Sequence, residues 1–592
     1  MASLLFVPPI GGLPLWLVVA AVAGLALYYI RLALLPKPIP GIPCNNGAEK
    51  SIFGDMLDFA RHVATTGEPM DWFRRQTEKH RTPLLQVFPR PFGKPFVLLS
   101  DFGEVQAMML SRKNVFDRSS LFRDILGGAG EHHHILKKSG KEWQSQRSLL
   151  ADLMVPAFLH NVAAPHIYTA VHNIIDLWEA KTRIAEGRPF RIDLDVDYLA
   201  LDAVLAFTYG DSYPERAVVS QIDGLEAFSD KDILTLRKKA QKLGDDAPMD
   251  FPPAPIHEDM TAILTMVHMA ETLQSSVFPT FTWWWLSKTS KIRNAWARRD
   301  GLVASQIGKA VDRLHENGED DTWLRNAVDL IVNRVRSFAK REGREPSYIN
   351  PMTLEEVFGF TMAGQESSSS TLIWALKYLT NHQDVQKKLR SVLHASHKQA
   401  FAEKREPSVS EITHTQIPYL DAVMNECLRL GTPIPFLARD AEVDTEILGV
   451  HIPKGTTIFA HTLGPSLMTP TLDIDPKLRY QTPQGSRTGE WDDEDKPRFR
   501  PERWLVESRD PKTGETTVAY NPNAGPFLAF GIGQRACFGR RMGLFEFRNS
   551  LTLLIWHFEF MPVPEALASY DARDGLTRRP KAPFVRTRRV VY

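Results

Sequence analysis

The feature that most limits how this chain can fold is an uncharged apolar run near its N-terminus. The sequence LPLWLVVAAVAGLALYYI occupies residues 13–30, and after Arg31 the apolar sequence resumes as far as Leu35. Its length is close to the ~20 residues that cross the hydrocarbon core of a bilayer. We therefore predict a membrane anchor over residues 1–35. A stiff Pro-rich linker follows over residues 36–45, and one folded domain over residues 46–592.

The charges around this run predict its orientation. Residues 1–12 carry no charged side chain, whereas Arg31 and Lys37 flank the far end. The positive-inside bias places the C-terminal side in the cytosol. A cleaved signal peptide needs a basic start and a small-residue cleavage site, and neither is evident, so an uncleaved single-pass anchor is favoured over a signal peptide or a buried core helix.

Composition excludes several classes of protein. The formal net charge is only +1, which argues against a nucleic-acid binder, because such proteins carry a strong basic excess. Apolar residues make up 43% and charged residues 24%, which excludes wholesale disorder. Cys44, Cys427 and Cys537 are too few for a disulfide framework and indicate a reducing compartment.

Apolar residues at three- and four-residue spacing predict a mainly α fold with a small β subdomain. The clearest predicted helices cover residues 162–180, 353–379 and 418–430; the second should begin with a capping box from Thr353 to Glu356. Strand-like segments cover residues 95–100, 446–450 and 456–460. Residues 482–501, with the acidic run 492–495, are interpreted as a solvated loop.

The candidate chemistry lies in the segment FGIGQRACFG, residues 530–539, just before an apolar helical stretch. A thiolate at a helix N-terminus is stabilised by the free N–H groups and by the helix dipole, and Cys537 has that position. Gly533 and Gly539 permit turns and close approach of the backbone to a flat partner, and Arg535 can bind an anionic group on it. The alternative is that Cys537 is an inert core thiol, which is the default for a lone cysteine.

This decapeptide resembles the cysteine-ligand loop of the cytochrome P450 family, the haem-thiolate monooxygenases. The resemblance implies a cytochrome P450 fold and haem b as cofactor, with Cys537 as the axial thiolate on iron. It also implies that Arg535 meets a haem propionate, that Phe530 packs beside the cysteine, and that Gly539 belongs to the haem-binding loop.

A second resemblance concerns a structural triad. Glu426-Cys-Leu-Arg429 looks like the family's Glu-x-x-Arg pair, whose side chains share one helix face. The segment FRPERW, residues 499–504, resembles the family's Pro-Glu-Arg-Phe element, with Trp504 in place of the usual Phe. By analogy Arg503 joins Glu426 and Arg429, and one buried carboxylate shared by two arginines would fix the loop against the helix.

A third resemblance is to the family's oxygen-activation stretch. The segment AGQES, residues 363–367, provides small residues that let a ligand approach the helix. It also provides an acid, Glu366, beside an alcohol, Ser367, that can relay protons as the catalytic pair. Serine stands where the family usually has threonine, so the hydroxyl is kept but the methyl that restrains its rotamer is lost. The alternative is a solvated polar patch on a helix.

Trp143 and Arg147 resemble the family's Trp-x-x-x-Arg, in which both side chains donate to a haem propionate from one helix face. The simpler alternative is an aromatic ring resting on an arginine. Arg439 is a weaker candidate, either a basic group near the haem or a surface ion-pair partner.

Two clusters are open to more than one interpretation. The histidines at positions 132–134 could bind a metal, but adjacent side chains point apart, so a solvated loop is favoured. The tryptophans at positions 283–285 belong either to the core or to an amphipathic surface that enters the headgroup region, and the surface is favoured.

Together these resemblances imply a monooxygenase that inserts one oxygen atom into an apolar small molecule. The sequence has no flavin or nicotinamide fingerprint, so electrons should come from a separate NADPH-cytochrome P450 reductase, with cytochrome b5 as a further partner. The linker and loop insertions resemble fungal microsomal members of secondary metabolism, anchored in the endoplasmic reticulum membrane with a cytosolic catalytic domain. Two alternatives stay open: a haem-thiolate isomerase or dehydratase that acts on a peroxide without a reductase, and a non-catalytic haem-binding protein.

Overall fold

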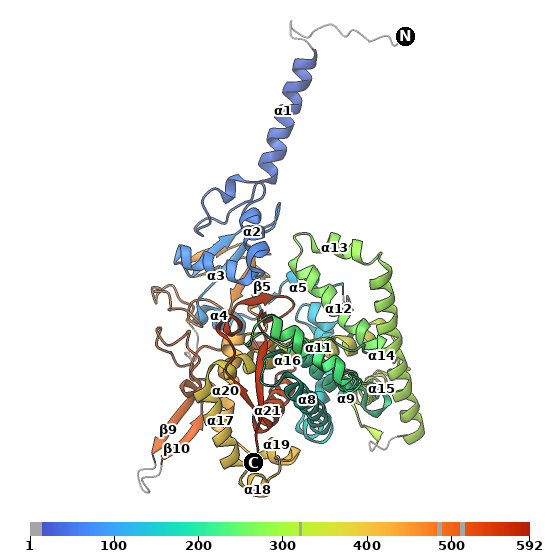
Figure 1. Cartoon of the computed structure of the whole chain (residues 1–592). Coiled ribbons are helices and arrows are strands. Elements are labelled where there is room, and N and C mark those ends of the chain that lie inside the picture. The colour runs from blue at the N-terminus through green and yellow to red at the C-terminus, as the bar shows by residue number, and fades with distance from the viewer. Residues whose placement is uncertain (1–14, 129, 319–322, 482–487, 510–515, 592) are drawn as a thin grey trace, which may run out of the picture.

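The computed structural model describes residues 15–128, 130–318, 323–481, 488–509 and 516–591 (Figure 1). It is mainly helical with small sheets, as predicted. Its α-helices are α1 (Leu15–Leu34), α2 (Met56–Thr66), α3 (Pro69–His80), α4 (Phe102–Leu110), α5 (Leu121–Leu126), α6 (Lys141–Ser148), α7 (Pro156–Phe158), α8 (Ala164–Ala185), α9 (Asp193–Tyr209), α10 (Ala217–Glu226), α11 (Asp230–Lys242), α12 (Glu258–Ser275), α13 (Pro279–Leu286), α14 (Ser290–Asn317), α15 (Ala327–Glu342), α16 (Pro351–Asn381), α17 (Gln383–Ser396), α18 (Lys398–Ala402), α19 (Val409–His414), α20 (Pro418–Gly431), α21 (Arg540–His557) and α22 (Glu565–Ala568).

The largest sheet among the described residues has the order β1 (Leu84–Val87), β2 (Phe96–Leu99), β8 (Thr457–His461), β5 (Phe436–Ala441) and β3 (Phe116–Arg118). Only its β2–β8 pair is parallel. A smaller sheet joins β11 (Phe558–Met561), β14 (Phe584–Arg589) and β4 (Phe190–Arg191). Further two-stranded units pair β6 (Thr445–Ile447) with β7 (Val450–Ile452), β9 (Leu505–Arg509) with β10 (Thr516–Tyr520), and β12 (Ala572–Asp574) with β13 (Arg578–Pro580).

Helix α1 stands apart from the folded body (Figure 1). Its segment Trp16–Leu34 is long and apolar enough to cross a membrane, and none of it is buried within the structure. This is the apolar helix that the sequence predicts, although residues 1–14 of the predicted anchor lie outside the described part of the chain. The Pro-rich segment after it is not a free spacer, because the Gln86 side chain accepts from Ile39 N and donates to Ile42 O.

The predicted capping box at Thr353 is wrong. Helix α16 begins at Pro351, and its N-cap is Asn350, whose side chain accepts from Thr353 N. Proline at the first helical position has no N–H to satisfy, which favours the earlier start. Glu356 is therefore free of a capping role and turns toward the histidines at 133 and 134.

The predicted strand over residues 446–450 is also wrong. The chain turns at Leu448 and Gly449, both with positive φ, and residues 445–452 form the β6–β7 hairpin. A two-residue turn of this kind matches the twist of the paired strands, and an apolar residue at its first position gives no sequence signal. The strands predicted near residues 95–100 and 456–460 are present as β2 and β8.

One polar contact joins helices distant in sequence. Glu406 lies between α18 and α19, and its carboxylate meets Tyr168 Oη at 2.7 Å, His172 Nε2 at 2.9 Å and His557 Nε2 at 2.6 Å. Burial raises the pKa of Glu406, but the hydrogen bonds from His172, His557 and Tyr168 outweigh burial and place it below its ordinary value. The same carboxylate raises the pKa of His172. The contact fixes α8 to the end of α21.

We expect Glu406→Gln to lower the free energy of unfolding by about 1–3 kcal/mol near neutral pH, because the charged hydrogen bonds are lost. A carboxyl group whose pKa is lowered on folding stabilises the protein at pH values above the pKa of that group in the unfolded chain. A histidine whose pKa is raised on folding stabilises the protein below the histidine's pKa in the unfolded chain. The loss should therefore be largest between these two values, at about pH 5–6. Thermal unfolding of wild type and variant at several pH values measures it. Glu403→Gln, in the same loop, is the matched control; a loss independent of pH would contradict the prediction.

Candidate functional site

The cysteine loop is a tight turn that ends at a helix. Cys537 N donates to Phe530 O at 2.8 Å, and Gly539 is the N-cap of α21. The backbone N–H groups of Gly539 and Arg540 point at the Cys537 sulfur. Burial raises the pKa of the thiol, and these N–H groups together with the nearby cations Arg147 and Arg540 oppose it. The sulfur is thus exposed to the cavity that it lines and meets the N–H groups at the start of α21 on its protein side.

A glycine is required at one position of this loop. Gly533 has a φ of +77°, and a Cβ there would lie 2.3 Å from Met109 O at the end of α4. Any other side chain would push the loop away from α4. The sequence predicts the conformational freedom of Gly533, but it does not predict the contact with α4 that makes a glycine necessary there.

One apolar cavity brings together most of the residues singled out by sequence. Its lining includes Trp143, Arg147, Glu366, Ser367, Phe530, Arg535, Cys537 and Gly539. Glu426, Arg429 and Arg503 do not line it, in keeping with a structural role. Phe530 lies beside Gly543 of α21, and the guanidinium of Arg540 lies 5.6 Å from its ring centroid.

Four arginines surround one end of this cavity: Arg118, Arg147, Arg439 and Arg535. Arg118 and Arg439 are directly opposite each other in the β3–β5 register, an arrangement that like charges disfavour. Burial lowers the pKa of Arg439 and of Arg535 to about 10. Burial, with Arg535 and Arg439 close by, lowers the pKa of Arg118 well below its ordinary value. Asp117 is the carboxylate that counters this lowering of the pKa at both Arg439 and Arg535.

These arginines fit the acidic edge of a haem. Among the described residues, Arg535 Nε and Nη1 and Arg118 Nε are buried without a hydrogen-bond partner. Buried donors of this kind are costly unless an anion accepts from them. The Arg147 and Arg535 guanidinium groups lie 5.1 and 4.5 Å from the Trp143 ring centroid, so both cations pack against the same indole. Arg147 also donates to Gln534 O at 3.0 Å, which joins α6 to the cysteine loop.

Glu426, Arg429 and Arg503 form a buried cluster, with a fourth member that sequence did not predict. Arg429 donates to both oxygens of Glu426, at 2.7 and 2.9 Å, and Arg503 Nε donates at 3.0 Å. Trp504 Nε1 donates to the same carboxylate at 2.9 Å. Trp504 was noted only as a departure from the family's phenylalanine, yet its indole supplies a hydrogen bond that phenylalanine cannot.

Glu366 and Ser367 do not contact each other through hydrogen bonds. Ser367 Oγ donates to Ala363 O at 2.7 Å, one turn back along α16. Glu366 is buried and accepts from Thr577 Oγ1 at 2.7 Å and from Arg579 Nη2 at 2.8 Å. Burial alone would lower the pKa of Arg579, but Asp197 and Glu366 outweigh it and raise that pKa. Both predicted relay residues border the cavity, but the acid is held by C-terminal residues that sequence reasoning missed.

Sequence reasoning also missed a second acid on the cavity wall. Glu546 of α21 accepts from Ser368 Oγ of α16 at 2.6 Å, and burial raises its pKa to about 7. The signal in the sequence that could have identified Glu546 is its position as an acidic residue within the apolar stretch of α21.

The tryptophans at 283–285 divide between core and surface. Trp283 packs against Trp296 in a tilted arrangement with ring centroids 5.5 Å apart, whereas Trp284 and Trp285 are 54% and 63% exposed. Phe281, on the same helix, is exposed as well. Figure 1 shows this helix, α13, at the same end of the folded body as α1. Two of the three rings therefore lie at the surface, and their entry into the headgroup region stays a prediction.

Comparison with known proteins gives consistent results. A sequence profile described as Cytochrome P450 matches residues 47–465 and 490–585. The chain is 36% identical to the cytochrome P450 monooxygenase TRI13 of Fusarium sporotrichioides, over 95% of this chain and 97% of that one. It is 34% identical to the cytochrome P450 monooxygenase GME11363 of Pestalotiopsis microspora, over 96% and 97%. It is 32% identical to the cytochrome P450 monooxygenase xilC of Penicillium rubens, over 95% and 94%.

We expect Trp504→Phe to destabilise the protein by about 1–3 kcal/mol, because the fully buried Glu426 carboxylate loses a donor. Thermal or denaturant unfolding measures the loss. The conservative change Trp285→Phe, at an exposed ring, serves as the control and should leave stability unchanged. Equal stability of the Trp504 variant and wild type would show that the indole hydrogen bond contributes nothing.

Proposed function

This chain belongs to the cytochrome P450 family and is a cytochrome P450 monooxygenase, and on that premise we propose that it inserts one oxygen atom of O₂ into an apolar small molecule in fungal secondary metabolism. The observation that carries the proposal is the convergence, around one apolar cavity, of the Cys537 sulfur and a set of arginines with unpartnered buried donors. Electrons would come from a separate NADPH-dependent reductase, with cytochrome b5 as a further partner.

We assign the haem contacts to residues of this chain. Cys537 would hold the iron of haem b through its thiolate, which the N–H groups at the start of α21 would stabilise. Trp143, Arg147 and Arg535 would donate to the propionates, as their sequence motifs predict. To these the geometry adds Arg118, which faces the sequence candidate Arg439 across β3 and β5, and buried Arg439 is assigned to the haem and not to a surface ion pair. When bound, a thiolate-ligated haem supplies the redox chemistry that activates O₂.

The remaining cavity residues position the substrate and limit water. Much of the wall is apolar, with Val196, Leu199 and Phe207 from α9, and Phe358 and Met362 from α16. Such a wall binds apolar molecules and places no specific polar demand on them. Gly364 packs against Val204, which keeps α16 close to α9 at this point.

Protons would reach the cavity through hydroxyl and carboxyl groups of α16. Ser367 Oγ lies at the wall and can turn from Ala363 O to a molecule in the cavity. Glu366 would hold or accept a proton at its carboxylate, with Thr577 Oγ1 beside it and Arg579 fixing its position. These roles separate the monooxygenase from a peroxide isomerase, which has less use for proton delivery.

The protein would be held at the cytosolic face of the endoplasmic reticulum by two elements. Helix α1 spans the membrane, and the exposed aromatic residues of α13 enter the headgroup region at the same end of the molecule (Figure 1). This arrangement would place an entrance for apolar substrates near the bilayer.

We expect haem-loaded wild type to give the long-wavelength ferrous–CO absorption of thiolate ligation, and Cys537→Ser to lose it, because the sulfur ligand is gone. Substrates found by spectral titration with terpenoids, polyketides, alkaloids and fatty acids should then gain one oxygen atom only with NADPH, reductase and O₂. Cys44→Ser is the control and should keep both properties. Rearrangement of a peroxide without reductase would support the isomerase instead.

Deleting residues 1–35 should leave a protein that still associates with liposomes, because α13 presents its own aromatic surface. Adding Trp284→Ser and Trp285→Ser to the deletion should release most of the protein into the soluble fraction in a flotation assay. Ser substitutions at the exposed Val506 and Val518, on the hairpin β9–β10, are the matched control. Full solubility of the simple deletion would contradict a role for α13.

A further inference from the structure

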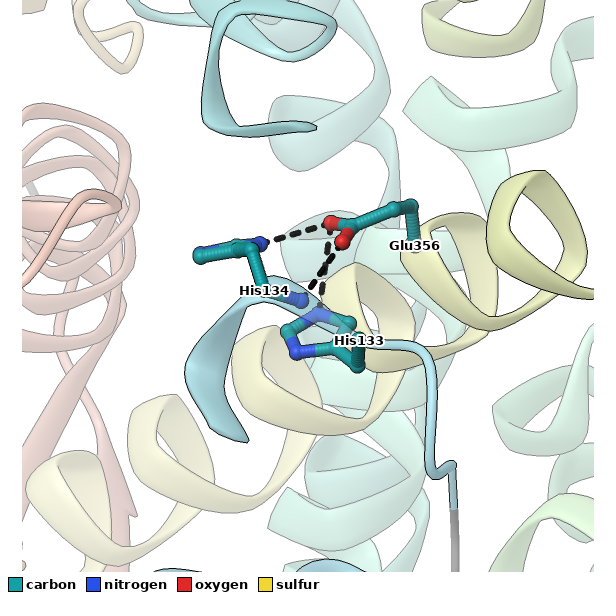
Figure 2. A group of neighbouring side chains, drawn as sticks. All are labelled: His133, His134 and Glu356. Carbon is teal, nitrogen blue, oxygen red and sulfur yellow. Dashed lines mark hydrogen bonds and ion pairs between the residues drawn. The ribbon is translucent and has the colours of Figure 1, made fainter. Parts of the chain in front are cut away.

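Two of the three histidines before α6 depart from the splayed, solvated loop that the sequence predicts, whereas His132 is exposed and pairs with Glu355. His133 is extended, with φ −65° and ψ 137°, and His134 starts a 3-10 helix over His134–Leu136. This change of backbone direction lets the two rings face the same way, with centroids 4.4 Å apart. Figure 2 shows both imidazoles directed at Glu356 of α16. The expectation that adjacent histidines point apart is therefore wrong for this pair.

Both imidazoles meet a single carboxylate oxygen. His134 Nδ1 lies 2.6 Å and His133 Nε2 lies 3.5 Å from Glu356 Oε2. The Glu356 side chain is fully buried, and those of His133 and His134 are nearly so. One candidate ligand atom from each of the three residues lies within 4.8 Å of the other two. Backbone N–H of His134 donates to the second oxygen, Glu356 Oε1, at 2.7 Å and fixes the carboxylate.

We propose that His133, His134 and Glu356 form a binding site for a divalent transition-metal ion, with Zn²⁺ as the best fit. Two imidazole nitrogens and one carboxylate oxygen are a ligand set that Zn²⁺ takes in proteins, with further positions left for water or another oxygen. Ligand atoms of a tetrahedral zinc site lie roughly 3.3 Å apart. The separations of 2.6 and 3.5 Å lie on either side of that value, and all three ligand atoms lie within 4.8 Å of one another.

The surroundings of His133 suit a ligand. A Cβ on Gly359 would lie 2.3 Å from His133 Nε2, so the glycine makes room for the imidazole against α16. His133 Nδ1 accepts from Ile135 N at 3.1 Å. Metal binding at Nε2 requires the proton on Nδ1, so that hydrogen bond would be exchanged for the metal bond.

The site opens toward the same cavity as the cysteine loop. His133, His134 and Gly359 contribute to the cavity wall, together with the neighbouring Glu355. An ion held there could bind an oxygen atom of a molecule in the cavity through its free positions. The ligand set includes none of the residues assigned to the haem. A failure to bind metal would therefore leave the proposed monooxygenase function standing, and a failure of the monooxygenase function would leave the metal site standing.

The first test measures Zn²⁺ on full-length, haem-loaded protein purified without a histidine tag. Metal analysis after dialysis against low Zn²⁺, with a competing chromophoric chelator, should give one tight site in wild type. His134→Gln and Glu356→Gln should each weaken that site at least tenfold, because a ligand is lost. His132→Gln is the matched control: His132 is adjacent but pairs with Glu355 instead, and its loss should leave affinity unchanged. Equal zinc binding by all four proteins would overturn the proposal.

A second measurement needs no variant, in case a substitution at buried Glu356 prevents folding. Anomalous diffraction at the zinc edge from wild-type crystals soaked in Zn²⁺ should show a peak between the three side chains. Peaks only elsewhere, or none, would mean that the cluster is a hydrogen-bonded contact between the loop and α16, and would overturn the metal site.

Discussion

The frame around the cavity depends on one buried negative charge. The Glu426 carboxylate is fully enclosed and accepts from Arg429, Arg503, Trp504 and the backbone N–H of Arg500. A charge removed from water in this way is tolerated only while its donors stay in place. Those donors come from α20 itself and from the segment that ends in Pro501–Trp504, so the carboxylate fixes one against the other. Helix α20 in turn packs against α16, which carries Glu366 and Ser367, and against α21, which carries Glu546.

One end of the cavity shows the opposite imbalance, an excess of positive charge. Arg118 and Arg439 face each other across two strands, and Arg535 keeps two buried donors without a partner among the described residues. Such an arrangement is unfavourable by itself and becomes favourable when a dianionic group accepts from it. Next to it stands a cysteine at a helix N-terminus, and beyond it an apolar wall. Two propionates, an iron atom and a flat apolar ring would satisfy the three regions together.

Sequence predicted the parts of this arrangement that local patterns encode. The cysteine loop, helix α20 with its Glu-x-x-Arg spacing, and the apolar helix α1 each depend on residues close together in the chain. Contacts between distant segments are not accessible from local patterns. Arg118 opposite Arg439, Arg579 on Glu366, and Trp504 on Glu426 are pairs whose members lie 78 or more positions apart, and only the folded sheet and helices bring them together. The histidine pair was misread because its geometry depends on a single change of backbone conformation at His133.

The central claim is that the Cys537 sulfur binds iron. X-ray absorption at the iron edge of the purified, haem-loaded protein reports the atoms bound to iron directly. The account predicts four porphyrin nitrogens and one sulfur ligand in wild type, with the sulfur absent in Cys537→Ser. Iron bound only by nitrogen and oxygen in the wild-type protein would contradict it.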